Sequence, residues 1–407
     1  MKVYKDGFLC YNGVEMNVFR EDNAMKRAID ELIAETAHAA AALRKLLHTT
    51  PELAGMEFKT AATLRQSLAG LPVELYPPFL QTDVVALLHG HKPGKNILLR
   101  ADIDALPMAG SPQHACGHDG HAAILWGAAK VLAAIREHWC GQVLLVFQPG
   151  EEIHAMAADL VETGVVDHFS PDGVYALHGW PGIPEGHIQT RAGAIMAAAG
   201  FFRFRLEGRG GHGSRPESAL NPLPAASKLV ERLTGLPDCL STREKIVVTV
   251  CHISGGSNAN VIPDDAIAEG TTRFLNESDG QLVQLALQET AENIEKETGV
   301  KVHPEYHAHY PPTINDPAAI ERVRACLQKL NPGIGWRELA ESCMASDDFA
   351  YFLRKGPGAY FHLGLGEACP SLHSPEFEFN DNALATGIAL LVASVLSHQD
   401  GQIPTMY

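Results

Sequence analysis

The sequence predicts an α/β protein whose first domain, a central mixed sheet flanked by helices, is interrupted by an inserted α+β domain. Short apolar runs alternate with helical stretches over roughly the first half of the chain. From about residue 193 apolar and charged residues alternate instead, and Pro311-Pro312 marks the return to the first pattern. We therefore expect residues 1–192 and 308–407 to form one split domain and residues 193–307 to form the inserted one.

The first domain should begin with a short leader to residue 20. Helices are expected over residues 21–48 and 60–71, because apolar residues recur there at helical spacing, and a third, rich in Ala and Leu, over 120–135. Short apolar runs predict four buried strands, over Val84–Leu88, Ile97–Ala101, Val143–Phe147 and Val174–Leu177. Strands that alternate with helices favour a sheet covered by helices.

In the inserted segment, Phe202, Phe204 and Leu206 alternate with charged residues, which is typical of a half-exposed strand. The other elements expected there are a helix over 222–234 that Gly235 ends, strands over 246–253 and 266–275, and a helix over 281–298. This β-α-β-β-α order predicts a small α+β unit of ordinary domain size.

Composition limits the partners of the protein. Of its 407 residues, 32 are Lys or Arg and 48 are Asp or Glu, so the net charge is −16, which disfavours nucleic acid and anionic lipid as partners. The first residues lack the apolar stretch of a secretory signal, and no apolar run is long enough to cross a membrane. Eight cysteines without a CxxC pair are typical of reduced thiols. We therefore expect a cytoplasmic protein.

The clearest chemical signal is the run QHACGHDGH at residues 113–121, between an expected strand and an expected helix. Cys116 and His118 offer thiolate and imidazole, which zinc and other late first-row metals prefer. A polar helix start capped by Asp119 is the alternative, and for a lone His it would be the better one. A Cys-x-His-x-x-His cluster in this position favours a metal site.

Further candidates follow the expected strands. Glu151 and Glu152 occur in QPGEE, where one carboxylate could hold metal and the other move a proton. His178 and Asp102 follow two other strands, and His373 lies in the motif LHSP. Each residue alone is explained as well by a helix start, a satisfied His or a turn cap. Their shared position at strand ends favours a single crevice.

The inserted segment has polar features of its own. GRGGHGSRP exposes His212, NVIPD contains Asn260, and GTTRF contains Arg273, which could bind a carboxylate through two parallel hydrogen bonds. A surface turn and a surface arginine are the plainer interpretations of these residues.

Nine segments occur in the order found in one enzyme family: RADIDALP, HACGHDGH, QPGEE, ALHGWPGIPEG, GRGGHGSRP, NVIPD, GTTRF, SDDFAYFL and LHSPEFEFND. From about residue 40 to 395 the chain resembles the amidohydrolase branch of the aminoacylase/carboxypeptidase G2-like metallopeptidases, which includes hippurate hydrolases, N-acyl-amino-acid amidohydrolases and auxin-conjugate hydrolases. The resemblance implies a catalytic domain with two divalent metal ions and an inserted lid domain through which two subunits form a homodimer.

The resemblance also implies a role for each candidate. The metal ligands would be Cys116, His118, Glu152, His178 and His373, and the general base would be Glu151. His212 would reach a reaction centre, and Asn260 and Arg273 would contact the carboxylate end of a small-molecule substrate. Asp102 would orient a ligand or cap a turn. Zinc, manganese, nickel and cobalt all suit this ligand set, and we hypothesise that Cys116 bridges the two ions.

The implied reaction is hydrolysis of the amide bond of N-acyl amino acids, such as N-acetyl or N-benzoyl derivatives. Two alternatives stay open: a dipeptidase or aminopeptidase with the same metals, and a non-catalytic metal-binding dimeric scaffold, against which the intact Glu151 argues. The chain departs from the family in a short loop over 109–113. It also departs in Ile153–Ala158, where the family has a glycine-rich stretch. Both departures could reshape the substrate pocket.

Overall fold

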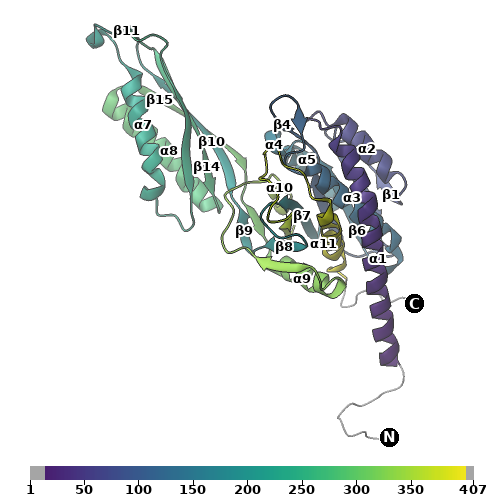
Figure 1. Cartoon of the computed structure of the whole chain (residues 1–407). Helices are drawn as coiled ribbons and strands as arrows, with labels where there is room; N and C mark the ends of the chain where they lie inside the picture. Colours follow the sequence, from purple (N-terminus) through teal and green to yellow (C-terminus); the bar gives the residue numbers. More distant parts are fainter. Residues whose placement is uncertain (1–13, 400–407) are drawn as a thin grey trace. The chain divides into compact units, whose positions relative to one another are not determined.

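The computed structural model describes residues 14–399, which form two compact units (Figure 1). The first unit contains the chain up to Ala192, Asn315–Leu339 and the chain from Phe352 onward. The second contains Gly193–Ile314 and Ala340–Tyr351. The first unit has a large mixed sheet flanked by helices, so the predicted α/β class is confirmed.

The eight-stranded sheet of the first unit has the order β1-β2-β6-β3-β7-β18-β8-β17. The bounds are β1 Val73–Leu75, β2 Val84–His89, β3 Asn96–Asp102, β6 Gln142–Gln148, β7 Gly173–Trp180, β8 His187–Thr190, β17 Gly335–Glu338 and β18 Gly358–Gly364. The central strands β6, β3, β7 and β18 run parallel to one another. Their carboxyl ends therefore share one edge of the sheet, and β3, β6 and β7 are almost wholly buried.

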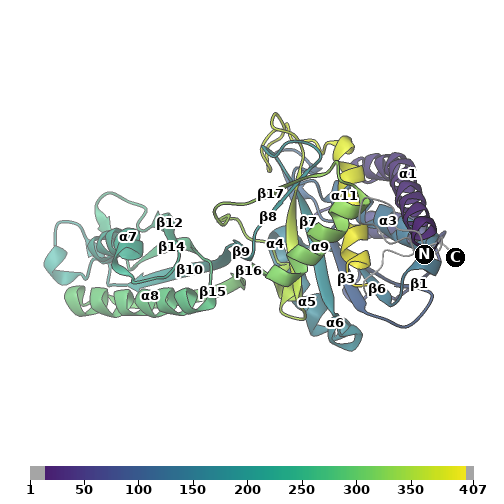
Figure 2. The same ribbon diagram turned by 90° about the horizontal axis from the view of Figure 1, so that it is seen from below.

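Helices of the first unit are α1 Val14–His48, α2 Phe58–Leu68, α3 His118–Ala134, α4 Glu151–His154, α5 Met156–Glu162, α6 Val165–Phe169, α9 Pro317–Leu330 and α11 Leu384–Leu396. Figures 1 and 2 show α1, α3 and α11 lying together, with α9 beside α11. α3 and α11 are apolar nearly all round and are buried along most of their length, as expected of helices enclosed by neighbours. α1 begins at Val14, so part of the expected leader is helical.

Shorter elements lie between these strands and helices. β4 (Leu106–Pro107) and β5 (Pro112–Gln113) form a small hairpin, and α10 (Ala350–Leu353) contains residues of both units. No helix among residues 14–399 is both long and apolar enough to cross a membrane.

The second unit has a four-stranded antiparallel sheet in the order β12-β14-β10-β15, with α7 and α8 packed on it. Its elements are β9 Gly193–Met196, β10 Ala198–Glu207, β11 Gly211–His212, α7 Pro222–Cys239, β12 Val247–Ser254, β13 Val261–Ile262, β14 Asp265–Phe274, α8 Glu277–Thr298, β15 Lys301–Tyr310 and β16 Thr313–Asn315. Burial alternates along β10 and β14, so one face of the sheet packs on the helices and the other is open.

Side-chain caps fix the starts of the helices in this unit. Asn221 accepts a hydrogen bond from the Leu223 N–H at the start of α7, where Pro222 takes the first helical position. Asn276 does the same for Asp279 in α8. The prediction that Gly235 ends the first helix is wrong, because α7 continues to Cys239 and Gly235 lies inside it.

Glycine has a packing role where α3 begins. A Cβ on Gly120 would lie 2.4 Å from Cδ2 of Phe379, whose ring is buried against the helix. Only glycine therefore lets this ring approach the helix that begins at His118. Gly235 in α7 has open space around it, so a side chain at this position would not collide with a neighbour.

These two glycines give a matched stability test. Gly120→Ala should lower the free energy of unfolding by about 1–3 kcal/mol, because the added methyl group collides with Phe379. Gly235→Ala should raise it by about 0.5–1 kcal/mol, because alanine loses less conformational entropy in a helix. Urea unfolding of both variants measures the changes. Equal effects of the same sign would contradict the packing assigned to Gly120.

Candidate metal centre

The parallel strands and the start of α3 supply the candidate metal ligands. Cys116 precedes α3 and His118 is its first residue, while Glu152 lies in α4 just after β6. His178 lies in β7. His373 lies in the loop after β18, where its φ of +63° is unusual for a residue with a side chain and its N–H donates to the Ala115 carbonyl at 2.8 Å.

The structure brings the five predicted ligands together. The Cys116 Sγ lies 3.4 Å from Nε2 of His178 and 3.3 Å from Nε2 of His373. The Glu152 Oε1 lies 3.5 Å from Nε2 of His373 and 3.7 Å from Nε2 of His118. One sulfur, three imidazole nitrogens and one carboxylate thus face a common space, which is a donor set that late first-row metals accept.

Two of the three histidines are held by their other ring nitrogen. The Nδ1 of His118 lies 3.1 Å from an Asp104 carboxylate oxygen, and the Nδ1 of His178 lies 2.8 Å from the Gly179 carbonyl. With the proton on Nδ1 donated outward, Nε2 of each ring is directed to the shared space. Ligating histidines in proteins commonly have this arrangement.

His121, the second histidine of the Cys-x-His-x-x-His motif, is not directed to the ligands in this way. His121 donates from Nδ1 to Asp102 at 2.6 Å, and its Nε2 accepts the Gly179 N–H at 2.8 Å, so both ring nitrogens are used. Asp102 also accepts from Arg100 at 2.8 Å. Asp102 therefore binds a buried Arg and His121 while its second oxygen lies 3.7 Å from Nε2 of His118.

Sequence reasoning missed Asp104, which contacts the ring of His118 and accepts the Glu152 N–H at 3.0 Å. The signal was present, since RADIDALP contains a second Asp two positions after Asp102. His121 was noticed only as part of its motif. Its contact with Asp102 depends on β3 and α3 meeting in space, which spacing along the chain does not show.

The site carries an excess of negative charge. Burial alone lowers the pKa of His118, but the carboxylates of Asp102, Asp104 and Glu152 outweigh it and raise that pKa to about 10. Burial, with the charges of Glu152 and Glu151, raises the pKa of the Cys116 thiol well above its usual value. Without a metal the site thus retains protons, and a bound cation would supply the missing positive charge.

Two buried atoms support the fit to a metal. Nε2 of His118 and Oε1 of Glu152 have no hydrogen-bond partner among the described residues, although buried polar atoms normally have one. Burial lowers the pKa of His178 well below its usual value, which keeps that ring neutral and able to bind metal. The residues present therefore fit a metal centre.

The candidates from the inserted segment lie in the second unit. His212, in β11, is exposed, and its Nδ1 accepts from the Ser214 hydroxyl at 2.8 Å. Asn260 is its neighbour across the turn, because the Asn260 carbonyl accepts the Gly213 N–H at 2.8 Å. Arg273, in β14, donates to the Thr272 carbonyl at 2.9 Å and has no carboxylate partner within residues 14–399.

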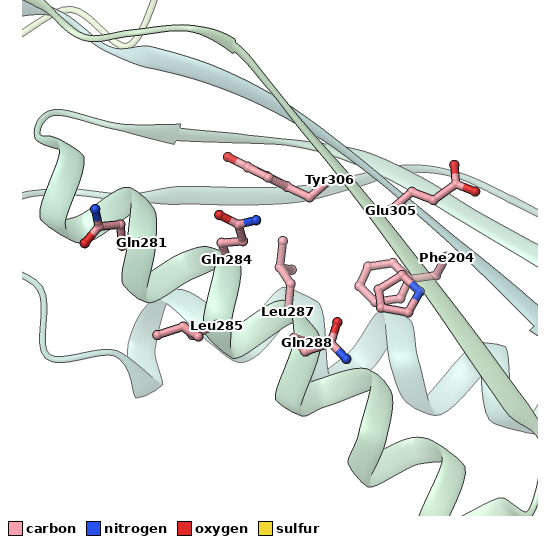
Figure 3. A pocket seen from close by; sticks show the side chains of 9 residues that line it. Phe204, Gln281, Gln284, Leu285, Leu287, Gln288, Glu305 and Tyr306 are labelled. Carbon is pink, nitrogen blue, oxygen red and sulfur yellow. The ribbon is translucent and has the colours of Figure 1, made fainter.

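A hollow in the second unit is not a metal site. It measures about 550 Å³ and lies between α8 and β15, as Figure 3 shows. Its lining is Phe204, Gln281, Gln284, Leu285, Leu287, Gln288, Pro304, Glu305 and Tyr306. Glu305 is the only residue among them with a metal-binding side chain of the usual His, Cys, Asp or Glu types, and one carboxylate does not make a site.

Residues 98–397 match the Peptidase family M20/M25/M40. N-acetyl-L-cysteine deacetylase of Bacillus subtilis (strain 168) is 34% identical over 359 residues, which cover 84% of this chain and 84% of that protein. IAA-amino acid hydrolase ILR1-like 2 of Arabidopsis thaliana is 32% identical over 370 residues, covering 86% of this chain and 82% of that protein. A crystal structure of a dinuclear metal-binding peptidase of the M20 family from Bacillus subtilis has a TM-score of 0.78 and 28% identity, and covers 89% of this chain and 99% of that one.

Together with the donor set of the site, these similarities define a metal-dependent hydrolase that acts on amide bonds. The chain belongs to the Peptidase family M20/M25/M40. The family resemblance recognised from the motifs is therefore confirmed.

The raised pKa values of His118 and Cys116 predict how metal binding depends on pH. Near neutral pH, below the His118 pKa of about 10, the metal-free site holds a proton on each residue, and binding must release them. The affinity should therefore rise with pH, by up to about tenfold per pH unit for each proton released. Competition titration with a chelator from about pH 6 to about pH 8 measures it.

A Cys116→Ser variant serves as the control for this titration. Because the serine hydroxyl is not deprotonated in this range, the pH slope should decrease by about one proton. If the metal affinity of the unmodified protein does not change with pH, His118 and Cys116 are not protonated in the metal-free site.

Proposed function

We propose that this protein hydrolyses the amide bond of N-acyl amino acids, with N-acetyl, N-benzoyl or similar acyl groups, and releases a carboxylic acid and a free amino acid. The observation that carries this proposal is the gathering of five donor side chains next to Glu151. The names of the similar deacetylase and IAA-amino acid hydrolase support this substrate class.

Five side chains would hold two divalent ions, namely Cys116, His118, Glu152, His178 and His373. Zinc, manganese, nickel and cobalt all suit them. When bound, the ions polarise the scissile carbonyl and lower the pKa of the attacking water. The Cys116 Sγ lies 3.4 and 3.3 Å from the His178 and His373 nitrogens, so its thiolate would hold an ion together with these imidazoles.

Glu151 is the residue that would move the proton. It is the first residue of α4, is buried and directly precedes Glu152, and its charge contributes to the raised pKa of Cys116. It would take the proton from the attacking water and deliver it to the leaving amine nitrogen. The hydroxide that remains adds to the acyl carbon, and the transferred proton goes to the amine that leaves, so the cleavage of the C–N bond is balanced.

The substrate's carboxylate would be bound from the second unit. Arg273 is half buried and lacks a carboxylate partner within residues 14–399, and burial lowers its pKa, so an anionic ligand would stabilise the guanidinium. Asn260 would add an amide, and His212 would stabilise the charge that develops on the carbonyl oxygen. A free α-amine is not needed for any of these contacts, which favours N-acyl amino acids over dipeptides.

A homodimer through the inserted unit is also part of the proposal. The sheet has two edges, β12 and β15. β15 carries Lys301, Pro304 and Glu305, which discourage pairing with another strand. β12 contains no Lys, Arg, Asp or Glu, and its Ile253 is 52% exposed. A second copy would therefore pair along β12.

Glu151→Gln tests the reaction. With metals restored, hydrolysis of N-acetyl and N-benzoyl amino acids should fall by roughly 100- to 10,000-fold while the metal content stays unchanged, since only proton transfer is lost. Glu162→Gln, an exposed residue of α5, is the control and should keep full activity. If Glu151→Gln keeps full activity, Glu151 does not move the proton and the mechanism is wrong. If the unmodified protein prefers free dipeptides in the same substrate panel, the dipeptidase or aminopeptidase alternative is favoured.

The proposed interface has its own test. Ile253→Asp places a charge on the exposed edge of β12 and should convert the dimer to a monomer in light scattering. Glu305→Lys on the opposite edge is the control and should leave the mass unchanged. A protein that is monomeric from the start, or an Ile253→Asp variant that stays dimeric, would argue against pairing along β12.

A further inference from the structure

Glu151 and Glu152 begin a helix that is too short to hold itself in place. α4 spans four residues, Glu151–His154, and its N-cap Gly150 has a φ of +66° and no side-chain cap. The first N–H groups of any helix lack partners inside the helix, and a single turn is unstable alone. The direction of both carboxylates therefore depends on which groups outside α4 bind its first N–H groups.

Two buried carboxylates from elsewhere in the chain bind this turn. The Glu57 Oε1 accepts the Gly150 N–H at 3.0 Å, and the Asp104 Oδ2 accepts the Glu152 N–H at 3.0 Å. Asp104 also contacts His118, so it belongs to the metal site already described. Glu57 lies just before α2 and makes no hydrogen bond or ion pair with a candidate ligand, and it belongs to none of the motifs singled out from the sequence.

Glu57 is fully buried and is held by hydrogen bonds. Its Oε1 also accepts the Gly55 N–H at 2.9 Å, and its Oε2 accepts from the Thr82 hydroxyl at 2.8 Å. No Lys, Arg or His within residues 14–399 pairs with it, and burial raises its pKa. Burying a carboxylate without a cation costs free energy, and the hydrogen bonds that Glu57 accepts offset part of this cost.

The turn at Gly150 leaves little freedom for another arrangement. Its φ is in the left-handed region, and a Cβ there would lie 2.3 Å from the Met156 sulfur. The Glu57 carboxylate therefore fixes a glycine whose backbone directly precedes Glu151. A displacement of about 1 Å in a group that moves a proton can cost roughly 100-fold in rate.

We propose that Glu57 is a positioning residue: by binding the Gly150 N–H it sets the direction in which α4 presents Glu151 to the reaction. This inference rests on the proposed amidohydrolase function. Glu57 acts through the backbone and has no part in binding substrate or metal.

Substitutions at Glu57 separate positioning from folding. Glu57→Ala removes the acceptor, and kcat should fall about 10- to 100-fold while KM changes less than about threefold and the metal content stays the same. Glu57→Gln keeps an oxygen for Gly55 and Gly150 and should restore kcat to within about fivefold of the unmodified protein. Should Glu57→Ala not fold, Glu57→Asp keeps the charge and withdraws the carboxylate from Gly150, so it serves in its place.

Asp83→Ala is the matched control. Asp83 is also a fully buried carboxylate and accepts the Leu80 N–H, but it has no bond to α4. Its loss should lower stability and leave kcat within about threefold. A fall in kcat of the same size in Asp83→Ala as in Glu57→Ala would reduce Glu57 to a general structural role and overturn the inference.

Hydrogen exchange gives a readout that does not depend on turnover. In metal-free protein, the peptide containing residues 150–152 should exchange faster in Glu57→Ala than in Asp83→Ala, because only the first variant frees the Gly150 N–H. Unchanged exchange, or faster exchange with unchanged kcat, would overturn the role of Glu57. Absence of amidase activity in the unmodified protein would instead count against the proposed function, and the exchange result would still decide whether Glu57 holds Gly150.

Discussion

The candidate metal centre of the first unit depends on the parallel strands that bring several carboxylates to one buried edge of the sheet. Because β3, β6 and β7 run parallel, Asp102, Glu151 and His178 emerge at the same edge. Arg100 pairs with Asp102 at 2.8 Å and offsets part of this negative charge. The remaining negative charge is what raises the pKa of His118 to about 10. A centre of this kind is stable when a cation occupies it.

Around the ligands, a second layer of contacts decides how each one points. Asp104 and the Gly179 carbonyl hold the Nδ1 atoms of His118 and His178, so that Nε2 of each ring faces the shared space. Glu57 and Asp104 likewise hold the first turn of α4. The contacts to α4 join segments far apart in the sequence, so the geometry of this part of the site depends on the tertiary fold.

The second unit is organised on a different principle. Its sheet buries one face under α7 and α8 and leaves the other open, where ion pairs such as that between Arg203 and Glu269 join neighbouring strands. Arg273 departs from this pattern because it has no carboxylate partner within residues 14–399. A half-buried guanidinium in a protein with a net charge of −16 is suited to binding an anionic ligand from outside the chain.

The sequence by itself determined the α/β class, most buried strands and the candidate ligands, because apolar periodicity and motifs such as HACGHDGH are local signals. The ends of helices were harder to predict from the sequence. Gly235 lies inside α7, because the packing of α7 on the sheet outweighs the low helix propensity of glycine. Only the tertiary structure decided that His121 binds Asp102 and that Glu57 binds Gly150. These contacts join residues 19 and 93 positions apart, and burial makes their hydrogen bonds obligatory.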